Sequence, residues 1–254
     1  MKAVIARKPG SELADRIAKE AIEILRRHGV ETCDFPNCNP CESDFVVVIG
    51  GDGTLLYVAS KTPCDTPPII TIRAGRRAFL LELEESEVED GLKSFLEGRY
   101  SIEKHKRLRF GEFNAMNEIA VLSKGRRVTK LSVYSDGSKI YEGLEGDGLI
   151  ISTTLGSTAY ALSAGGPLID PRLDAILIVP VNPIQLNVRP VVLPSTAEVT
   201  INIEYNLEEV DVLIDGIIST KAKNISSSLD GPYVTLARFK PRKFYERLIE
   251  LRSL

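Results

Sequence analysis

Apolar residues follow two different periods along the first hundred residues. Residues 45–49 form an uninterrupted apolar run, Phe-Val-Val-Val-Ile, which is typical of a strand covered on both faces. In contrast, Leu13, Ile17, Ala21 and Ile24 recur at steps of three or four residues, the spacing of one helix face. The expected strands are residues 2–6, 45–49 and 69–72, and the expected helices are residues 11–28, 55–61 and 88–96. This alternation predicts a parallel sheet with helices on its faces.

Beyond about residue 110 the pattern changes to short runs rich in β-branched residues. Asp136-Gly137, between two of these runs, is a strong signal for a two-residue hairpin. The expected strands are residues 117–122, 130–134, 139–142, 149–152, 175–179, 198–204, 210–214 and 234–239. The second half is therefore predicted to be mostly antiparallel, as a sandwich or as paired sheets.

Residues 242–251 form a last amphipathic stretch, with Phe244, Leu248 and Leu251 on one side. We expect this stretch to form a helix that returns to pack on the N-terminal domain. The predicted organisation has three parts: an α/β domain over 1–108, a β-rich domain over 109–240 and the C-terminal helix over 241–254.

The composition is that of an ordinary globular protein. The chain has 254 residues, of which 43% are hydrophobic and 26% are charged, and this length allows one large domain or two modest ones. A formal net charge of -3 argues against a general nucleic-acid binder. Because no apolar run approaches ~18 residues and the N-terminal run is too short for a signal peptide, we expect no membrane span and a cytoplasmic location.

Four cysteines lie close together in the N-terminal part of the chain. Cys33, Cys38 and Cys41 have the spacing C-x4-C-x2-C, and Cys64 follows at a distance, as in some iron–sulfur ligand sets. The loop is interrupted by prolines, and no other redox signature accompanies it. Reduced surface thiols or one disulfide are therefore the favoured interpretation, with a cluster or a zinc site as the alternative.

The turn Gly50-Gly51-Asp52-Gly53-Thr54 follows directly after the apolar run at 45–49. Glycines allow the backbone to turn sharply and to approach a ligand closely, because no Cβ stands in the way. Thr54 is expected to cap the helix that follows, so that free N–H groups point into the turn and attract phosphate. Asp52 would repel phosphate, which indicates a base or a group beside a metal ion.

A second candidate site lies in the segment 147–167, which is dominated by small and hydroxyl-bearing residues. Ser157 and Thr158 are expected to cap a short helix whose hydroxyls and N–H groups face a ligand; close helix packing is the alternative. Asn117-Glu118, which opens an expected strand, is an amide and a carboxylate that can hold the two hydroxyls of a ribose. A polar pair on an edge strand is the alternative for these two residues.

The sequence resembles the NAD kinase family, also called ATP-NAD or polyphosphate-NAD kinases, over nearly its full length. The matching segments, in the family's order, are GGDGT at 50–54, NE at 117–118, DGLIIST at 147–153, GSTAYALSAGGP at 156–167 and RP at 189–190. The long segment at 156–167 is the most specific, since GGDGT is shared with diacylglycerol and sphingosine kinases. The resemblance implies an α/β N-terminal and a β-rich C-terminal domain, and transfer of a phosphoryl group to the 2′-hydroxyl of the adenosine ribose of NAD.

The resemblance also assigns roles to individual residues. Asp52 is similar to the family's general base, and Gly50, Gly51 and Gly53 are similar to its phosphate turn. Thr54 and Arg76 are further candidates for contact with the phosphate donor, with a solvated basic turn as the alternative for Arg76. The implied NAD-binding residues are Asp52, Gly53, Asn117, Glu118, Asp147, Thr158, Ala159, Tyr160 and Ser163. The chain departs from the family pattern in the segment 73–80, where Arg76 and Arg77 stand, and at Ile184 and Ile217.

The expected partners and cofactor follow from this chemistry. The resemblance implies NAD and either ATP or polyphosphate as substrates, and self-association into a homodimer or homotetramer. Mg²⁺ is the expected divalent cation, because it binds phosphate oxygens while it keeps several waters. Two other functions remain open at this point: a lipid or diacylglycerol-type kinase that shares GGDGT, and a non-catalytic regulator that binds dinucleotides.

Overall fold

The computed structural model describes residues 1–75, 78–125, 127–205, 210–241 and 244–252. The chain divides into two compact units: unit 1 comprises Met1–His105 and Tyr233–Leu254, and unit 2 comprises Lys106–Pro232. Two long strands, β5 (Ser101–Phe110) and β16 (Asn224–Arg238), contribute residues to both units. Unit 2 is therefore inserted into unit 1, and residues 233–240 belong with the α/β part rather than with the β-rich part.

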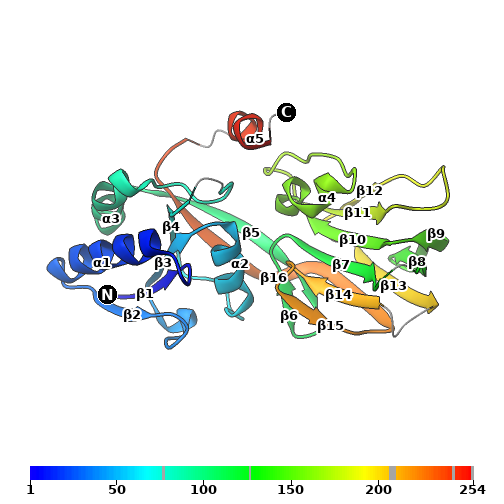
Figure 1. Cartoon of the computed structure of the whole chain (residues 1–254), viewed down its shortest axis with the longest axis horizontal. Coiled ribbons are helices and arrows are strands. Elements are labelled where there is room, and N and C mark those ends of the chain that lie inside the picture. Colours follow the sequence, from blue (N-terminus) through cyan, green and yellow to red (C-terminus); the bar gives the residue numbers. More distant parts are fainter. Residues whose placement is uncertain (76–77, 126, 206–209, 242–243, 253–254) are drawn as a thin grey trace. The chain divides into compact units, whose positions relative to one another are not determined.

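A parallel sheet forms the centre of unit 1 (Figure 1). Its strands are β1 (Lys2–Arg7), β2 (Glu31–Asp34), β3 (Phe45–Gly50) and β4 (Ile69–Arg73), in the order β2-β1-β3-β4, followed by β16. The register pairs Ala3 with Phe45 and Val46 with Ile69, and all of these pairings are parallel. The predicted parallel sheet is confirmed, and β2 is a strand that the apolar pattern did not indicate.

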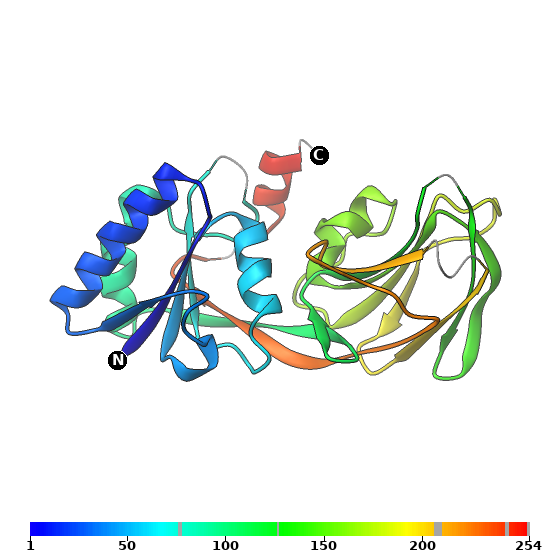
Figure 2. The same cartoon turned by 60° about the horizontal axis from the view of Figure 1, so that its bottom comes forward.

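Helices cover both faces of this sheet (Figure 2). They are α1 (Glu12–Arg27), α2 (Asp52–Ser60) and α3 (Val88–Leu96), with the short 3-10 helices η1 (Pro40–Glu42) and η2 (Glu85–Glu87). Ile17 of α1 and Leu92 of α3 share one core with Val47 of β3, whereas α2 covers the other face. Ser11 caps α1 by accepting a hydrogen bond from the Ala14 N–H at 3.3 Å.

The C-terminal helix α5 (Phe244–Arg252) belongs to unit 1. Phe244 and Leu248 are buried, and the Phe244 ring contacts the Phe79 ring edge-on at 5.6 Å between centroids. The predicted helix and its return to the α/β part are therefore confirmed. Arg242, Lys243 and the side chain of Leu251 lie outside the part of the chain that the structure describes.

Unit 2 is a sandwich of two mainly antiparallel sheets. One sheet has the order β12-β11-β10-β7-β14-β15, and the other contains β16-β13-β8-β9. The bounds are β6 (Phe113–Ala115), β7 (Glu118–Ser123), β8 (Thr129–Ser135), β9 (Ser138–Gly146), β10 (Gly148–Thr153), β11 (Ala175–Val181), β12 (Val191–Pro194), β13 (Glu198–Tyr205), β14 (Val210–Ile214) and β15 (Ile218–Thr220). The Asp136-Gly137 hairpin joins β8 and β9, with φ of 49° and 77° at its two residues.

The alternation along β7 explains how this sandwich packs. Ile119 and Val121 face the core between the two sheets, and Ala120 faces outward, where it packs with Ala161 of the short helix α4 (Tyr160–Ser163). One turn of 3-10 helix, η3 (Leu155–Thr158), precedes α4. The small residues of the segment 156–167 therefore do allow close packing against the sheet.

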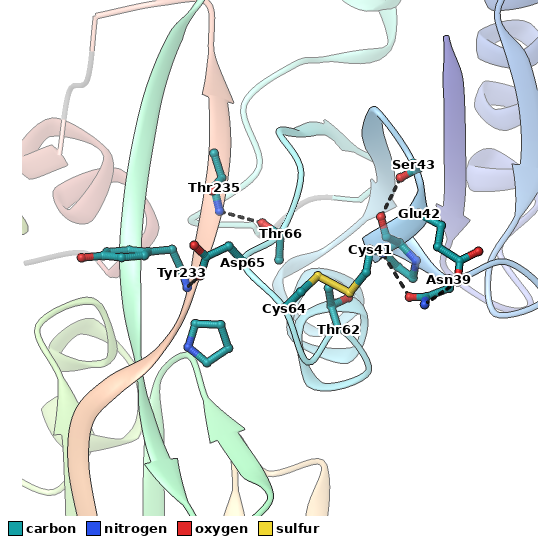
Figure 3. The surroundings of a disulfide bond; sticks show 12 residues. Asn39, Cys41, Glu42, Ser43, Thr62, Cys64, Asp65, Thr66, Tyr233 and Thr235 are labelled. Carbon is teal, nitrogen blue, oxygen red and sulfur yellow. Dashed lines mark hydrogen bonds between the residues drawn. A yellow bond between two sulfur atoms is a disulfide. The ribbon is translucent and has the colours of Figure 1, made fainter.

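All four cysteines form disulfides. Cys33 pairs with Cys38, and Cys41 in η1 pairs with Cys64 in the connection between α2 and β4 (Figure 3). The prediction of reduced thiols or of a single disulfide is therefore wrong, because the structure contains two disulfides. The alternative of a cluster or zinc site at these cysteines is wrong, because all four sulfur atoms are paired with one another in disulfides.

The connection that carries Cys64 is also tied to strand β16 (Figure 3). Asp65 accepts a hydrogen bond from the Tyr233 N–H at 2.8 Å, and the Thr66 hydroxyl accepts one from the Thr235 N–H at 2.8 Å. The second disulfide therefore joins η1 to a loop that is already fixed to the last strand of the unit. Within the described part of the chain, no helix has the length and apolar character needed to cross a membrane.

Candidate active site

The glycine turn lies between β3 and α2 in unit 1. Gly51 is the N-cap in an extended conformation, and α2 begins at Asp52. Thr54 is therefore the third helical residue and not the cap, which corrects the prediction; its hydroxyl reaches back to accept from the Gly51 N–H at 3.5 Å. A Cβ at Gly50 would overlap this hydroxyl, whereas a Cβ at Gly53 would meet nothing within 4 Å. The fold itself thus requires a glycine at position 50 but not at position 53.

The carboxylate of Asp52 is half-buried and held by two backbone groups. Its Oδ2 accepts from the Phe79 N–H at 2.8 Å, and its Oδ1 accepts from the Leu80 N–H at 2.8 Å. Each carboxylate oxygen has a second lone pair, so Asp52 keeps acceptor capacity for a further proton or ion. Arg76 and Arg77, which precede this segment, lie outside the described residues.

A cavity of about 460 Å³ lies on the same segment of unit 1. Phe79 and Leu80 line it, although Asp52 does not. The side chains around it are of mixed charge: the cationic ones are Arg73, Arg238, Lys240 and Arg247, and the anionic ones are Glu82, Glu84, Glu246 and Glu250.

In unit 2, Asp215 organises the Asn117–Glu118 turn. Its carboxylate accepts from the N–H groups of Met116 at 2.7 Å, Asn117 at 2.7 Å and Glu118 at 3.0 Å. Its own backbone has a φ of 50°, and its N–H donates to the Glu118 carbonyl at 3.0 Å. A short polar side chain tolerates this left-handed conformation better than most others. The turn is thus held in one conformation by a buried carboxylate.

Burial and charge perturb both carboxyl groups of this pair. Burial, and next the charge of Asp215, raise the pKa of Glu118 to about 8, although the Tyr160 N–H lowers it. Burial raises the pKa of Asp215 to about 6, against the three N–H groups and Arg107. Glu118 Oε2 is buried and has no hydrogen-bond partner among the described groups. A buried carboxyl oxygen of this kind indicates a ligand that exchanges a hydrogen bond with it.

The segment 153–158 packs directly against Asn117. The Thr153 hydroxyl donates to the Met116 carbonyl at 2.8 Å and accepts from the Gly156 N–H at 3.0 Å. A Cβ at Gly156 would overlap the carbonyl oxygen of Asn117. Gly156 is therefore required for the close approach of η3 to this turn.

Ser157 and Thr158 do not cap a helix, which corrects the prediction. The Thr158 hydroxyl donates to the Leu155 carbonyl at 3.0 Å, and the Ser157 hydroxyl accepts from the Ile169 N–H at 3.2 Å. Both residues lie inside η3 and are buried. The residue at the N-cap position of the next helix, α4, is Ala159. The Thr158 hydroxyl thus bonds the backbone of η3 itself, and the Ser157 hydroxyl bonds the backbone of the loop that follows α4.

The remaining expected residues occupy two places in unit 2. Ala159, Tyr160 and Ser163 lie at α4, where the Tyr160 ring is 37% exposed and its N–H interacts with Glu118. Asp147 is exposed between β9 and β10 and accepts from the Asn182 side-chain amide at 2.7 Å. Since Gly148 pairs with Leu122 and Ser152 with Glu118, Asp147 and Glu118 lie at opposite ends of β7 and β10.

Sequence reasoning overlooked three groups that support these sites. Asp215 had one local signal, the Asp-Gly pair that directly follows an expected strand at 210–214. Arg238 and Arg247, which contact the segment 78–81, had none, because their partners lie far away along the chain.

Comparisons with known proteins identify related sequences for both parts of the chain. The family model of the ATP-NAD kinase N-terminal domain matches residues 14–100, and that of the C-terminal domain matches residues 116–227. An NAD kinase of Aeropyrum pernix is 37% identical over an alignment of 268 positions, gaps included, that covers 96% of this chain and 95% of the relative.

Solved structures show the same fold. A crystal structure of an NAD kinase from Archaeoglobus fulgidus in complex with ATP has a TM-score of 0.86 at 29% identity and covers 100% of both chains. Yeast NADH kinase complexed with NADH has a TM-score of 0.88 at 23% identity, over 98% of this chain and 86% of that one, a likeness of fold alone.

Proposed function

The chain belongs to the NAD kinase family and is a phosphotransferase acting on NAD, and we propose that Asp52 is its general base. In this role Asp52 accepts the proton of the 2′-hydroxyl of the adenosine ribose while that oxygen attacks the terminal phosphorus of the donor. The observation that carries the proposal is the half-buried carboxylate of Asp52, oriented by two backbone N–H groups at the end of a buried strand.

The position of Asp52 suits the needs of phosphoryl transfer. Such reactions depend on positioning and on stabilisation of charge more than on covalent help from the protein. The two N–H groups hold the carboxylate plane, and each oxygen keeps a free lone pair for the hydroxyl proton. Asp52 receives the proton late, as the oxygen–phosphorus bond forms and the bond from phosphorus to the leaving oxygen breaks.

We propose ATP as the phosphoryl donor, held by the glycine turn. The ATP complex of the Archaeoglobus fulgidus structure supports this choice of donor. The first N–H groups of a helix have no intrahelical acceptor. In α2 the Thr54 N–H donates to the Gly51 carbonyl at 2.9 Å, so the N–H groups of Asp52 and Gly53 are the ones that would bind phosphate oxygens. Because the fold leaves open space around Gly53, a ligand that passes close to the backbone explains the absence of a side chain there.

Mg²⁺ fits this site as an ion that arrives with the donor. It binds through one or two carboxylates plus substrate phosphates and keeps several waters, rather than in a cage of protein ligands. The described residues contain no cluster of three acidic, His or Cys ligands, which agrees with such a mode, and Asp52 is the carboxylate at the turn. Bound there, the ion would neutralise phosphate charge.

We propose that Asn117 and Glu118 bind NAD through ribose hydroxyls. The buried Oε2 of Glu118 lacks a partner among the described groups, and a ribose hydroxyl, which can both donate and accept, can satisfy it whether Glu118 is protonated or ionised. The Tyr160 backbone N–H interacts with Glu118, and Tyr160 itself is partly exposed at the start of α4. Three expectations remain predictions: self-association, which the resemblance implies, a cytoplasmic location, which the apolar pattern suggests, and a contact of Arg76 with the donor phosphates.

The test is Asp52→Asn, assayed for NADP formation with ATP, with polyphosphate and without a donor. We expect the turnover number to fall by about 10²–10⁴, the range for a lost general base, while the Kd for NAD by calorimetry stays within about threefold. Asp65→Asn is the matched control, because Asp65 also accepts a backbone N–H in unit 1. Normal turnover of Asp52→Asn would remove Asp52 from the mechanism.

A further inference from the structure

The segment 78–81 lies between Asp52 and two arginines of the C-terminal part of unit 1. It has no regular secondary structure, so its conformation depends on contacts with other parts of the chain. Its N–H groups at Phe79 and Leu80 hold the Asp52 carboxylate, as described above. Three of its carbonyl groups accept hydrogen bonds from Arg238 and Arg247.

Arg247 comes from α5, which lies beside this segment (Figure 2). One of its terminal nitrogens, Nη2, donates to the Ala78 carbonyl at 2.7 Å and also to the Leu81 carbonyl. Burial lowers the pKa of this guanidinium, and the neighbouring charges of Arg73 and Arg238 lower it further, whereas Asp52 raises it. An arginine side chain nonetheless stays protonated in proteins, so Arg247 presents a fixed positive charge to these carbonyls.

Arg238, at the end of β16, holds the middle of the same segment. Its Nη1 donates to the Leu80 carbonyl at 2.9 Å, and its Nε donates to Glu103 at 2.6 Å. Glu103 and the nearby Glu82 thus fix the guanidinium on its other sides. This side chain is only 14% exposed, which makes its geometry far less mobile than that of a surface arginine.

One peptide group connects Arg247 to Asp52 directly. The carbonyl of Ala78 accepts from Arg247, and the N–H of the same peptide unit, that of Phe79, donates to Asp52. In a trans peptide these two groups point in opposite directions, so a positive and a negative side chain polarise the unit from both sides. Rotation of this peptide would break both charge-assisted hydrogen bonds at once.

We propose that Arg247, assisted by Arg238, is a positioning residue that sets the orientation of the Asp52 carboxylate through the 78–81 segment. The proposal rests on the proposed role of Asp52 as the base. Neither arginine needs to touch a substrate in this role. Loss of Arg247 leaves the peptide free to rotate, and Asp52 then loses the donor to its Oδ2.

The expected kinetic signature is a fall in turnover without a matching loss of NAD binding. A misplacement of about 1 Å at a reacting group can cost ~10²-fold in rate. For Arg247→Ala we expect kcat to fall by about 10–100-fold, with the KM for ATP and the Kd for NAD changed by less than about threefold. Arg247→Lys keeps the charge but not the planar fork, and we expect it to retain an intermediate turnover.

The decisive experiment is a double-mutant cycle of Arg247→Ala and Asp52→Asn, with kcat measured on the full-length protein. If Arg247 acts through Asp52, adding Arg247→Ala to Asp52→Asn lowers kcat by less than about threefold more. Arg16→Ala is the matched control, because Arg16 forms an exposed ion pair with Glu85 in the same unit. Circular dichroism and melting curves establish that each variant is folded; if Arg247→Ala is not, the cycle is run with Arg247→Lys.

Each outcome separates this proposal from the one before it. Independent, multiplicative effects of the two substitutions, or a raised KM for ATP in Arg247→Ala, would show that Arg247 acts on the substrate and would overturn the positioning role. Unchanged kcat in a folded Arg247→Ala variant would overturn it as well, while leaving Asp52 as the base. Full activity of Asp52→Asn would instead refute the base itself.

Discussion

Glu118 makes the stability of unit 2 dependent on pH, and Glu118→Gln tests this dependence. Burial and the neighbouring Asp215 raise the pKa of Glu118 to about 8, from 4.5 in its ordinary environment. Between these two values the folded protein keeps a proton that the unfolded chain has lost. The free energy of unfolding therefore decreases as the pH rises through this range. Glutamine has nearly the same shape and cannot ionise, so the variant lacks this contribution.

The magnitude follows from the two pKa values. The cost of ionising Glu118 in the folded protein grows by ~1.36 kcal/mol per pH unit between them. Two pH units, from pH 6 to pH 8, would give ~2.7 kcal/mol. The change in the free energy of unfolding is somewhat smaller, ~2 kcal/mol, because near pH 8 about half of the folded molecules have already lost the Glu118 proton. For a chain of this size, ~2 kcal/mol corresponds to a shift of roughly 4–8 °C in melting temperature.

The assay is a set of melting curves for the parent chain and for Glu118→Gln at several pH values between 6 and 8, without NAD. We expect the melting temperature of the variant to rise, relative to the parent, by roughly 4–8 °C over this range. Glu142→Gln is the control: Glu142 is exposed, and Lys139 lowers its pKa. Parallel profiles for the parent and Glu118→Gln would show that Glu118 ionises normally and would refute the reasoning.

Three further predictions concern one disulfide and two glycines. Replacing Cys41 and Cys64 by serine removes a cross-link between positions 23 residues apart, and we expect a loss of ~3 kcal/mol in unfolding free energy by chemical denaturation; no change would mean that the pair does not form. Gly53→Ala should fold with unchanged stability, because the added Cβ meets only open space in the protein. The same Cβ would stand where the phosphate donor is proposed to approach the backbone, so we expect the KM for ATP to rise at least ~10-fold. A wild-type KM for ATP in Gly53→Ala would argue against contact between the donor phosphates and Gly53. Gly156→Ala should instead lower the free energy of unfolding by ~1–3 kcal/mol, because its Cβ would overlap the carbonyl oxygen of Asn117.

Local patterns predicted the parallel sheet and the strand that leads to Asp52. An uninterrupted apolar run such as 45–49 has few other interpretations, and the amphipathic period of α1 is regular over four turns. The start of α2 was misplaced because Thr54 is a good N-cap residue, whereas in the structure its hydroxyl reaches back to Gly51 from inside the helix.

Strand β5 could not be predicted, because its inward-facing side chains include charged ones. Arg107 is only 1% exposed and donates to the Pro232 carbonyl at 2.7 Å, so a residue type that normally marks the surface lies in the interior. The same limit applies to the supports of the site. Arg247 contacts Ala78 from 169 positions away, and Asp215 contacts Met116 from 99 positions away, which no local period encodes.

The insertion of unit 2 into unit 1 has a consequence for synthesis of the chain on the ribosome. Unit 2 is one contiguous segment, 106–232, so it can fold as soon as that segment has emerged. Unit 1 consists of two segments, 1–105 and 233–254, that are separated by unit 2 in the sequence. Its first segment therefore cannot complete its fold until the end of β16 and α5 have been synthesised. Because Arg247 follows unit 2 along the chain, the 78–81 segment can receive its hydrogen bonds, and Asp52 its full support, only after residues 106–232 have been synthesised.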